Sequence, residues 1–178
     1  MFDFTFVTYR NLPDLDPDDR LVQDLLTKEG LRVRAAIWND STVDWSISGI
    51  CVVRSTWDYH QQPERFINWM AEVDAVTTLL NPLELMMWNC RKTYLKDLAA
   101  KGVAIVPTVF VEPDNKTACL TSILKDNGWS EAVVKPMVGL ATFGVRKVSL
   151  NPADEQADQE HLQELLTKGT VLVQQFMP

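Results

Sequence analysis

The sequence lacks the features that mark several large classes of protein. Its 178 residues include 24 acidic and only 17 basic side chains, and the net charge of -7 argues against a nucleic-acid-binding protein, which needs a basic surface. The three cysteines, Cys51, Cys90 and Cys119, have no metal-ligand spacing, which favours reduced thiols in a cytoplasmic protein. No apolar run approaches the ~20 residues of a membrane span, and the start has no signal-peptide pattern. We therefore expect a cytoplasmic protein without nucleic-acid or membrane partners.

The first half of the sequence alternates between strand and helix patterns. Helical spacing follows the acidic turn at 13–19 and ends near Gly30, and a second helical pattern covers 63–75. Short apolar segments predict strands at 2–8, 33–37, 50–53 and 78–80. Strands that alternate with helices imply a parallel, doubly wound sheet, so the predicted fold class is α/β.

The pattern changes near residue 86. Beyond this point helical spacing predicts helices at 91–101, 117–127 and 158–168. Extended segments are expected at 103–111, 133–135, 145–150 and 171–175. Hairpin-like and helical connections between these strands indicate a small α+β unit that follows the first domain.

A lysine at the end of a buried strand is followed by a loop that contains two glycines. The ammonium of Lys135 is a point charge suited to phosphate oxygens. In the loop at 137–144, Gly139 and Gly144 let backbone amides approach an anion, and Thr142 adds a hydroxyl donor. Taken alone, Lys135 is better explained as a strand-end lysine that reaches solvent, and the alternative for the loop is a hairpin turn between Lys135 and Val145.

Two further segments carry residues suited to a nucleotide. Gln174 and Gln175 close the last strand, where backbone groups of an extended segment could read adenine, and Phe176 and Met177 could flank a purine. Lys92 is predicted to lie on a helix, facing the same site. The alternatives are an ordinary strand with a polar end and a lysine on a solvated helix face.

In their order along the chain, these segments resemble the ATP-grasp superfamily, closest to its glutathione-synthetase-like and ribosomal-modification ligase branch. The segments that carry the resemblance are 89–95, 102–108, 133–136, 137–144 and 172–176. The resemblance implies that residues 1–86 form a Rossmann-like pre-ATP-grasp domain. It also implies that residues 87–178 form the N-terminal lid subdomain of an ATP-grasp domain, which ends at the hinge and lacks the C-terminal subdomain.

The resemblance also implies a set of ATP contacts. These fall on Lys92, Lys135, Gly139, Thr142, Gly144, Gln174, Gln175, Phe176 and Met177. A complete member would be an ATP-dependent carboxylate–amine or carboxylate–thiol ligase that works through an acylphosphate, with Mg2+ bridging the phosphates. The metal ligands of the family lie beyond the hinge, outside this sequence. We therefore expect a chain that binds nucleotide but is inactive by itself.

The first half contains a candidate substrate site just after the strand at 50–53. In open α/β sheets ligands bind at the carboxyl ends of the strands. Arg54 could hold a small carboxylate substrate in a two-pronged contact, and Asp58 could orient an amine or a water molecule. The structural alternative is that Arg54 pairs with a nearby acid and that Ser55 or Asp58 caps the next helix.

Two further expectations concern the chain as a whole. The competing class of function is a non-catalytic module of the same fold, which binds a nucleotide weakly or binds a partner chain. If the chain ends at Pro178, the last strand and the loop at 137–144 would be left uncovered, and exposed apolar surface of this kind promotes association. Self-association near Phe176 is therefore expected.

Overall fold

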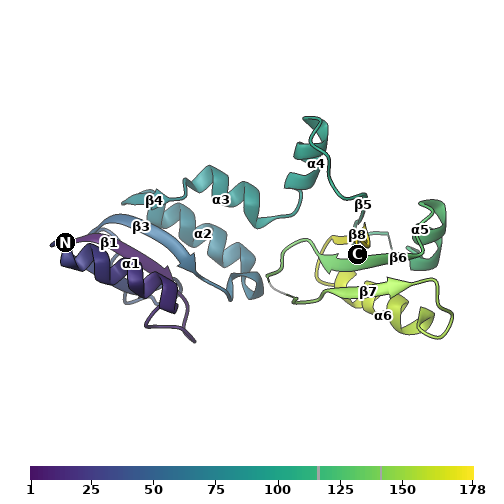
Figure 1. Ribbon diagram of the computed structural model, residues 1–178, viewed down its shortest axis with the longest axis horizontal. Helices are drawn as coiled ribbons and strands as arrows, with labels where there is room; N and C mark the ends of the chain where they lie inside the picture. Colours follow the sequence, from purple (N-terminus) through teal and green to yellow (C-terminus); the bar gives the residue numbers. More distant parts are fainter. Residues whose placement is uncertain (116, 141) are drawn as a thin grey trace. The chain divides into compact units, whose positions relative to one another are not determined.

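The computed structural model describes residues 1–115, 117–140 and 142–178, and the chain divides into two compact units (Figure 1). The first unit is Met1–Cys90 and the second is Arg91–Pro178. No helix in the described part of the chain is long and apolar enough to cross a bilayer.

The first unit is a four-stranded parallel sheet with helices between its strands. The sheet order is β2-β1-β3-β4, and every pairing is parallel. The strands are β1 (Phe2–Thr8), β2 (Val33–Ile37), β3 (Ser48–Ser55) and β4 (Thr78–Leu80). The helices are α1 (Pro17–Lys28), the short 3-10 turn η1 (Tyr59–Gln61), α2 (Pro63–Asp74) and α3 (Leu83–Cys90). The predicted parallel sheet is confirmed.

Helix α1 begins and ends where the sequence places its signals. The side chain of Asp16 accepts a 3.0 Å hydrogen bond from the N–H of Asp18, and Pro17 occupies the first turn, where its missing N–H costs nothing. Acidic side chains in that turn complement the helix dipole. Beyond the last turn Gly30 takes a φ of 87°, a left-handed conformation that favours glycine.

Both faces of the parallel sheet are covered. Phe6 and Val7 are neighbours on β1 and so point to opposite faces, yet they are only 4% and 0% exposed. This is the pattern of a doubly wound sheet. The core on one face joins the sheet to α2 and consists of Val7, Trp38, Cys51, Phe66, Trp69, Met70, Val73 and Leu79.

The second unit is an antiparallel sheet of order β5-β8-β6-β7. Its strands are β5 (Thr108–Val111), β6 (Glu131–Pro136), β7 (Arg146–Ser149) and β8 (Val171–Gln175). Its helices are α4 (Tyr94–Ala100), α5 (Leu120–Asp126) and α6 (Glu155–Leu166). The helices α5 and α6 share one hydrophobic core with the sheet, which includes Leu120, Leu124, Val134, Val148, Leu162, Leu165, Val171 and Val173. A parallel sheet followed by an antiparallel one confirms the mixed α/β fold class.

The position of β8 corrects one expectation. The sequence suggested that the last strand would be left uncovered, but β8 is hydrogen-bonded to β5 on one side and to β6 on the other. Its backbone groups are therefore satisfied within the sheet, and β8 offers no open edge for another chain. Although β8 follows the other strands in the sequence, it lies between β5 and β6 in the sheet.

Candidate functional site

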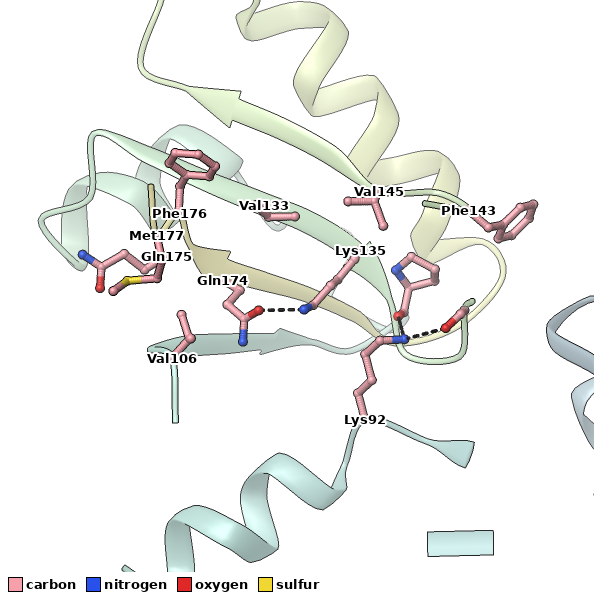
Figure 2. A pocket seen from close by; sticks show the side chains of 12 residues that line it. Lys92, Val106, Val133, Lys135, Phe143, Val145, Gln174, Gln175, Phe176 and Met177 are labelled. Carbon is pink, nitrogen blue, oxygen red and sulfur yellow. Dashed lines mark hydrogen bonds between the residues drawn. The ribbon is translucent and has the colours of Figure 1, made fainter. Parts of the chain in front are cut away.

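The second unit contains a cavity of about 410 Å3 (Figure 2). Its lining comes from the turn before α4, from β6 and the loop after it, and from the end of β8. The lining residues are Lys92, Val106, Val133, Lys135, Pro136, Gly139, Phe143, Val145, Gln174, Gln175, Phe176 and Met177. Every predicted nucleotide contact except Thr142 and Gly144 is among them. Residues 85 positions apart in the sequence, from Lys92 to Met177, thus meet at one cavity.

The alternation of β6 places Lys135 on the cavity side of the sheet. Ala132 and Val134 are fully buried and belong to the core beneath the helices. Because successive side chains of a strand point to opposite faces, Val133 and Lys135 lie on the other face, where they line the cavity.

A chain of hydrogen bonds fixes the ammonium of Lys135. Its Nζ donates a 2.6 Å bond to Oε1 of Gln174, and the two side chains point toward each other in Figure 2. The Nε2 of Gln174 donates to Oγ1 of Thr108 at 2.8 Å. The Thr108 hydroxyl in turn donates to the carbonyl oxygen of Val106 at 2.7 Å. The lysine is therefore tied through two side chains to the backbone before β5.

The structure corrects the predicted position of Lys92. The sequence suggested a helix over 91–101, but Lys92 lies in the turn before α4, where its backbone N–H donates to the carbonyl of Met137 at 3.1 Å. Its Nζ lies 3.2, 3.4 and 3.3 Å from the carbonyl oxygens of Pro136, Met137 and Gly139. Lys92 thus holds the start of the glycine-containing loop through both its backbone and its side chain.

Burial and mutual repulsion act on the two ammonium groups. Burial, followed by the positive charge of Lys135, lowers the pKa of Lys92 to about 8. Burial also lowers the pKa of Lys135 below its usual range. Among the described lining residues there is no carboxylate to offset these charges. The cavity is therefore a positively charged pocket, and an anion such as a phosphate group would relieve the repulsion.

Residues 142–144, at the end of the glycine-containing loop, form a turn. The N–H of Val145 donates to the carbonyl of Thr142 at 3.0 Å, and Gly144 has a φ of 67°. A Cβ on Gly144 would lie 3.2 Å from side-chain carbons of Leu165 and Pro136. Both the backbone conformation and the limited space therefore favour glycine at this position. Ala141, which falls within the predicted loop, lies outside the described residues.

One side of the cavity is apolar. Val106 and Val133 line it together with Phe176 and Met177, which follow β8. The Nζ of Lys147 lies 3.9 Å from the centre of the Phe176 ring, a cation–π contact that fixes the ring. A flat, apolar ring such as a purine base matches this side of the cavity better than a charged group does.

Sequence reasoning missed several residues that hold segments adjoining the cavity. Nε2 of His161 on α6 lies 3.1 Å from the carbonyl oxygen of Gly144, although His161 has the pattern of a surface residue. Asp158, only 2% exposed, accepts a 2.7 Å hydrogen bond from Nε of Arg146. Thr108 holds Gln174. These contacts join residues that are 12 to 66 positions apart, so no local pattern announces them.

In the first unit, the structure gives partners to both candidate substrate residues. Nε of Arg54 donates to Oδ1 of Asp19 at 2.7 Å, and the hydroxyl of Ser55 donates to Oδ2 of the same carboxylate at 2.6 Å. Asp58 accepts a 2.7 Å hydrogen bond from Nε1 of Trp38 and makes no side-chain cap to η1. The ion pair foreseen as the structural alternative for Arg54 is present, whereas the foreseen helix cap by Ser55 or Asp58 is not, since neither η1 nor α2 has a side-chain cap.

The donor set of the cavity does not suit Mg2+. This ion prefers carboxylate oxygens, whereas the charged groups among the described lining residues are two ammonium groups. Nor do residues 1–115, 117–140 and 142–178 contain a cluster of three or more His, Cys, Asp or Glu that could hold a metal. No step of the chemistry is therefore assigned to a metal held by these residues.

Comparison with known proteins finds similar proteins both by sequence and by structure. Residues 4–81 match the family model of the D-cycloserine synthetase DcsG N-terminal domain. The cycloserine biosynthesis protein DcsG of Streptomyces lavendulae is 32% identical over 148 residues, which cover 82% of this chain and 49% of that protein. The chain thus spans about half the length of this curated relative.

Three solved structures show how far the fold is shared. The crystal structure of D-cycloserine synthetase DcsG superposes with a TM-score of 0.83 at 28% identity, over 98% of this chain and 59% of that one. A RimK-domain ATP-grasp protein from Sphaerobacter thermophilus gives 0.71 at 16% identity, over 99% and 64%. D-alanyl-alanine synthetase A from Vibrio cholerae gives 0.69 at 13%, over 100% and 61%. These structures confirm the resemblance to the ATP-grasp fold, over 59%, 64% and 61% of the three matched chains.

Proposed function

We propose that this chain is the nucleotide-binding N-terminal part of a ligase that joins a carboxylate to an amine or a thiol through an acylphosphate. The observation that carries the proposal is that Lys92, Lys135 and the end of β8 line one cavity. The cavity combines a cationic side, which suits the phosphates of a nucleoside triphosphate, with an apolar side, which suits its base. Similarity to ATP-grasp ligases supports ATP as the nucleotide.

Each part of the cavity has a role in this proposal. The ammonium groups of Lys92 and Lys135 bind phosphate oxygens, and the loop that carries Gly139, Thr142 and Gly144 covers them. Adenine lies against the apolar side beside Phe176 and Met177. Neutralising phosphate charge is what a phosphoryl transfer most requires of a protein, since the reaction is catalysed mainly by positioning and electrostatics.

We assign the carboxylate substrate to the first unit. Asp19 binds the Nε of Arg54 from one side, and the arginine side chain remains 51% exposed, so its terminal nitrogens can face a carboxylate. Asp58, held by Trp38, would act by fixing the loop after β3 rather than by touching the reacting atoms. Relatives named for making D-cycloserine and D-alanyl-alanine favour a small, amino-acid-like acid.

The second candidate function is binding without catalysis. The absence of a carboxylate among the described lining residues favours it, because phosphoryl transfer from ATP normally uses a metal ion. In this version the same cavity holds a nucleotide, and the metal ligands of a complete ligase lie elsewhere. Self-association would have to use exposed side chains beside the cavity, such as Phe143 and Met177, because β8 has no open edge.

Calorimetric titration of the chain with ATP, with and without Mg2+, tests the proposal. We expect weak binding that the Lys135→Ala substitution reduces by about 1.5–3 kcal/mol, the scale of a hydrogen bond to a charged group. Lys125→Ala is the matched control, because Lys125 is an exposed lysine in the last turn of α5 and does not line the cavity. Equal affinity in the Lys135→Ala and Lys125→Ala variants would reject the site.

A further inference from the structure

The hydroxyl of Thr108 decides which way the amide of Gln174 points. This hydroxyl has one proton, and the proton is committed to the carbonyl oxygen of Val106 at 2.7 Å. Towards Gln174 its oxygen can therefore only accept, so it takes the NH2 end of the amide at 2.8 Å. The carbonyl end is left facing Lys135, whose ammonium can only donate. Each of the three hydrogen bonds from Lys135 to Val106 therefore has a single direction.

The opposite orientation of the amide is unfavourable at both ends. A reversed Gln174 would bring its NH2 group against the ammonium of Lys135, which places two donors together. It would also set its carbonyl oxygen against a hydroxyl oxygen whose proton points to Val106. Thr108 and Gln174 are directly paired residues on β5 and β8, so the backbone ladder holds the two side chains side by side.

We propose that Thr108 is a positioning residue of the nucleotide site: it orients the Gln174 amide so that its carbonyl oxygen holds the ammonium of Lys135 in the cavity. The role of Thr108 in nucleotide binding rests on the proposed function, whereas the effect of Thr108 on Lys135 can be tested without nucleotide. Thr108 touches no nucleotide in this scheme. It acts through Gln174, and it is absent from the residues that the sequence predicted.

A neutral partner suits this lysine better than an acidic one. A carboxylate at position 174 would pair with Lys135 and cancel the charge that a phosphate group needs. The glutamine carbonyl accepts a hydrogen bond from the ammonium and leaves its charge in place. The other titratable group that lines the cavity in the described residues is Lys92, which repels Lys135 and makes a fixed acceptor more valuable.

The test is to measure the pKa of Lys135 by NMR titration in the chain without nucleotide. The lysine side chains are labelled with carbon-13, and the Lys135 signal is identified as the one that is missing in the Lys135→Arg variant. In Thr108→Val, which has nearly the same shape, the amide of Gln174 is free to reverse. The ammonium then loses its acceptor, so we expect a lower pKa for Lys135 than in the unsubstituted chain. Thr108→Ser keeps the hydroxyl and should restore the original pKa. Thr121→Val is the control, because Thr121 bonds Glu155 on the exposed side of the unit.

Two further measurements make the outcome decisive. Gln174→Leu should lower the pKa of Lys135 as Thr108→Val does, and the double variant should lower it no further, because both changes remove the same hydrogen bond. Thr108→Val should also weaken ATP binding about fivefold, the equivalent of one net hydrogen bond.

An unchanged Lys135 pKa in a folded Thr108→Val chain would overturn the proposal. If Thr108→Val failed to fold, Thr108→Ala, which also removes the hydroxyl, would replace it, and additive effects of Thr108→Ala and Gln174→Leu on the Lys135 pKa would overturn the proposal. Absence of ATP binding in the unsubstituted chain would instead reject the proposed function and leave the titration valid.

Discussion

The ammonium nitrogen of Lys92 lies 3.3 Å from the carbonyl oxygen of Gly139, in the loop that borders the cavity. Two more carbonyl oxygens of the same segment lie within 3.4 Å of it. In the chain without nucleotide, backbone carbonyl oxygens of the loop therefore contact the Lys92 ammonium, where phosphate oxygens would contact it in a nucleotide complex. A bound phosphate has to compete with these carbonyls for the ammonium, and it has the advantage of a full negative charge.

The first prediction is that nucleotide binding takes up a proton near pH 8. Burial and Lys135 lower the pKa of Lys92 to about 8, so part of its population is neutral there. A phosphate group favours the charged form and raises this pKa, so affinity should fall as the pH rises from about 7 to about 9. Calorimetry in buffers of different ionisation enthalpy measures the proton uptake. Lys92→Arg, which stays charged, should flatten the pH dependence, and an equally steep dependence in that variant would contradict the assignment.

The second prediction concerns the end of the glycine-containing loop. Gly144→Ala should destabilise the second unit by more than about 1–2 kcal/mol, because a left-handed backbone already costs this much for a residue with a Cβ. The added Cβ would also meet Pro136 and Leu165 at 3.2 Å. Gly128→Ala is the matched control, because Gly128 has a φ of 69° and no atom within 4 Å of its added Cβ. Hydrogen exchange of β6 and β8 amides measures the difference, and equal losses in the two variants would show that the loop end tolerates the methyl group.

The sequence predicts the strands of both units closely because their signals are local. The expected segments 2–8, 33–37, 78–80 and 171–175 coincide with β1, β2, β4 and β8. Apolar runs bounded by turn residues carry that information within a few positions. The helix expected at 91–101 begins only at Tyr94, because the N–H of Lys92 bonds to Met137 in a distant loop. A contact over 45 residues has no local signature.

The candidate site divides along the same line. Motif order placed Lys92, Lys135, Gly139 and the end of β8 together, and these residues do line one cavity. The residues that hold them were invisible to sequence reasoning. Thr108 is an unremarkable residue on a short strand, and only the pairing of β5 with β8 sets it opposite Gln174. Supporting contacts follow from sheet register, which is a property of the whole fold.

The third prediction is that the chain does not turn over ATP. The described lining of the cavity has no carboxylate to hold a metal or to act as a base. Phosphate release with ATP, Mg2+ and a set of small amino acids should therefore stay at background, while ATP still binds. Turnover in the ordinary enzyme range of about 1–1000 s−1 would show that the catalytic groups lie within these residues after all.

The last prediction separates the structural and functional roles of Arg54. Asp19 is 3% exposed and has bonds from Arg54 and Ser55, so Arg54→Ala leaves a buried carboxylate with one partner fewer. The first unit should lose about 1–3 kcal/mol of stability, the cost of an unsatisfied buried group. Asp19→Asn combined with Arg54→Ala should lose less than the sum of the single changes, because the two variants remove one interaction. Urea unfolding followed through β3 amide exchange gives these values.

The affinity of the Arg54→Ala variant for ATP should equal that of the unsubstituted chain, since Arg54 does not line the cavity of the second unit. Additive losses would show that the ion pair contributes nothing, and weakened ATP binding would move Arg54 from the carboxylate substrate to the nucleotide.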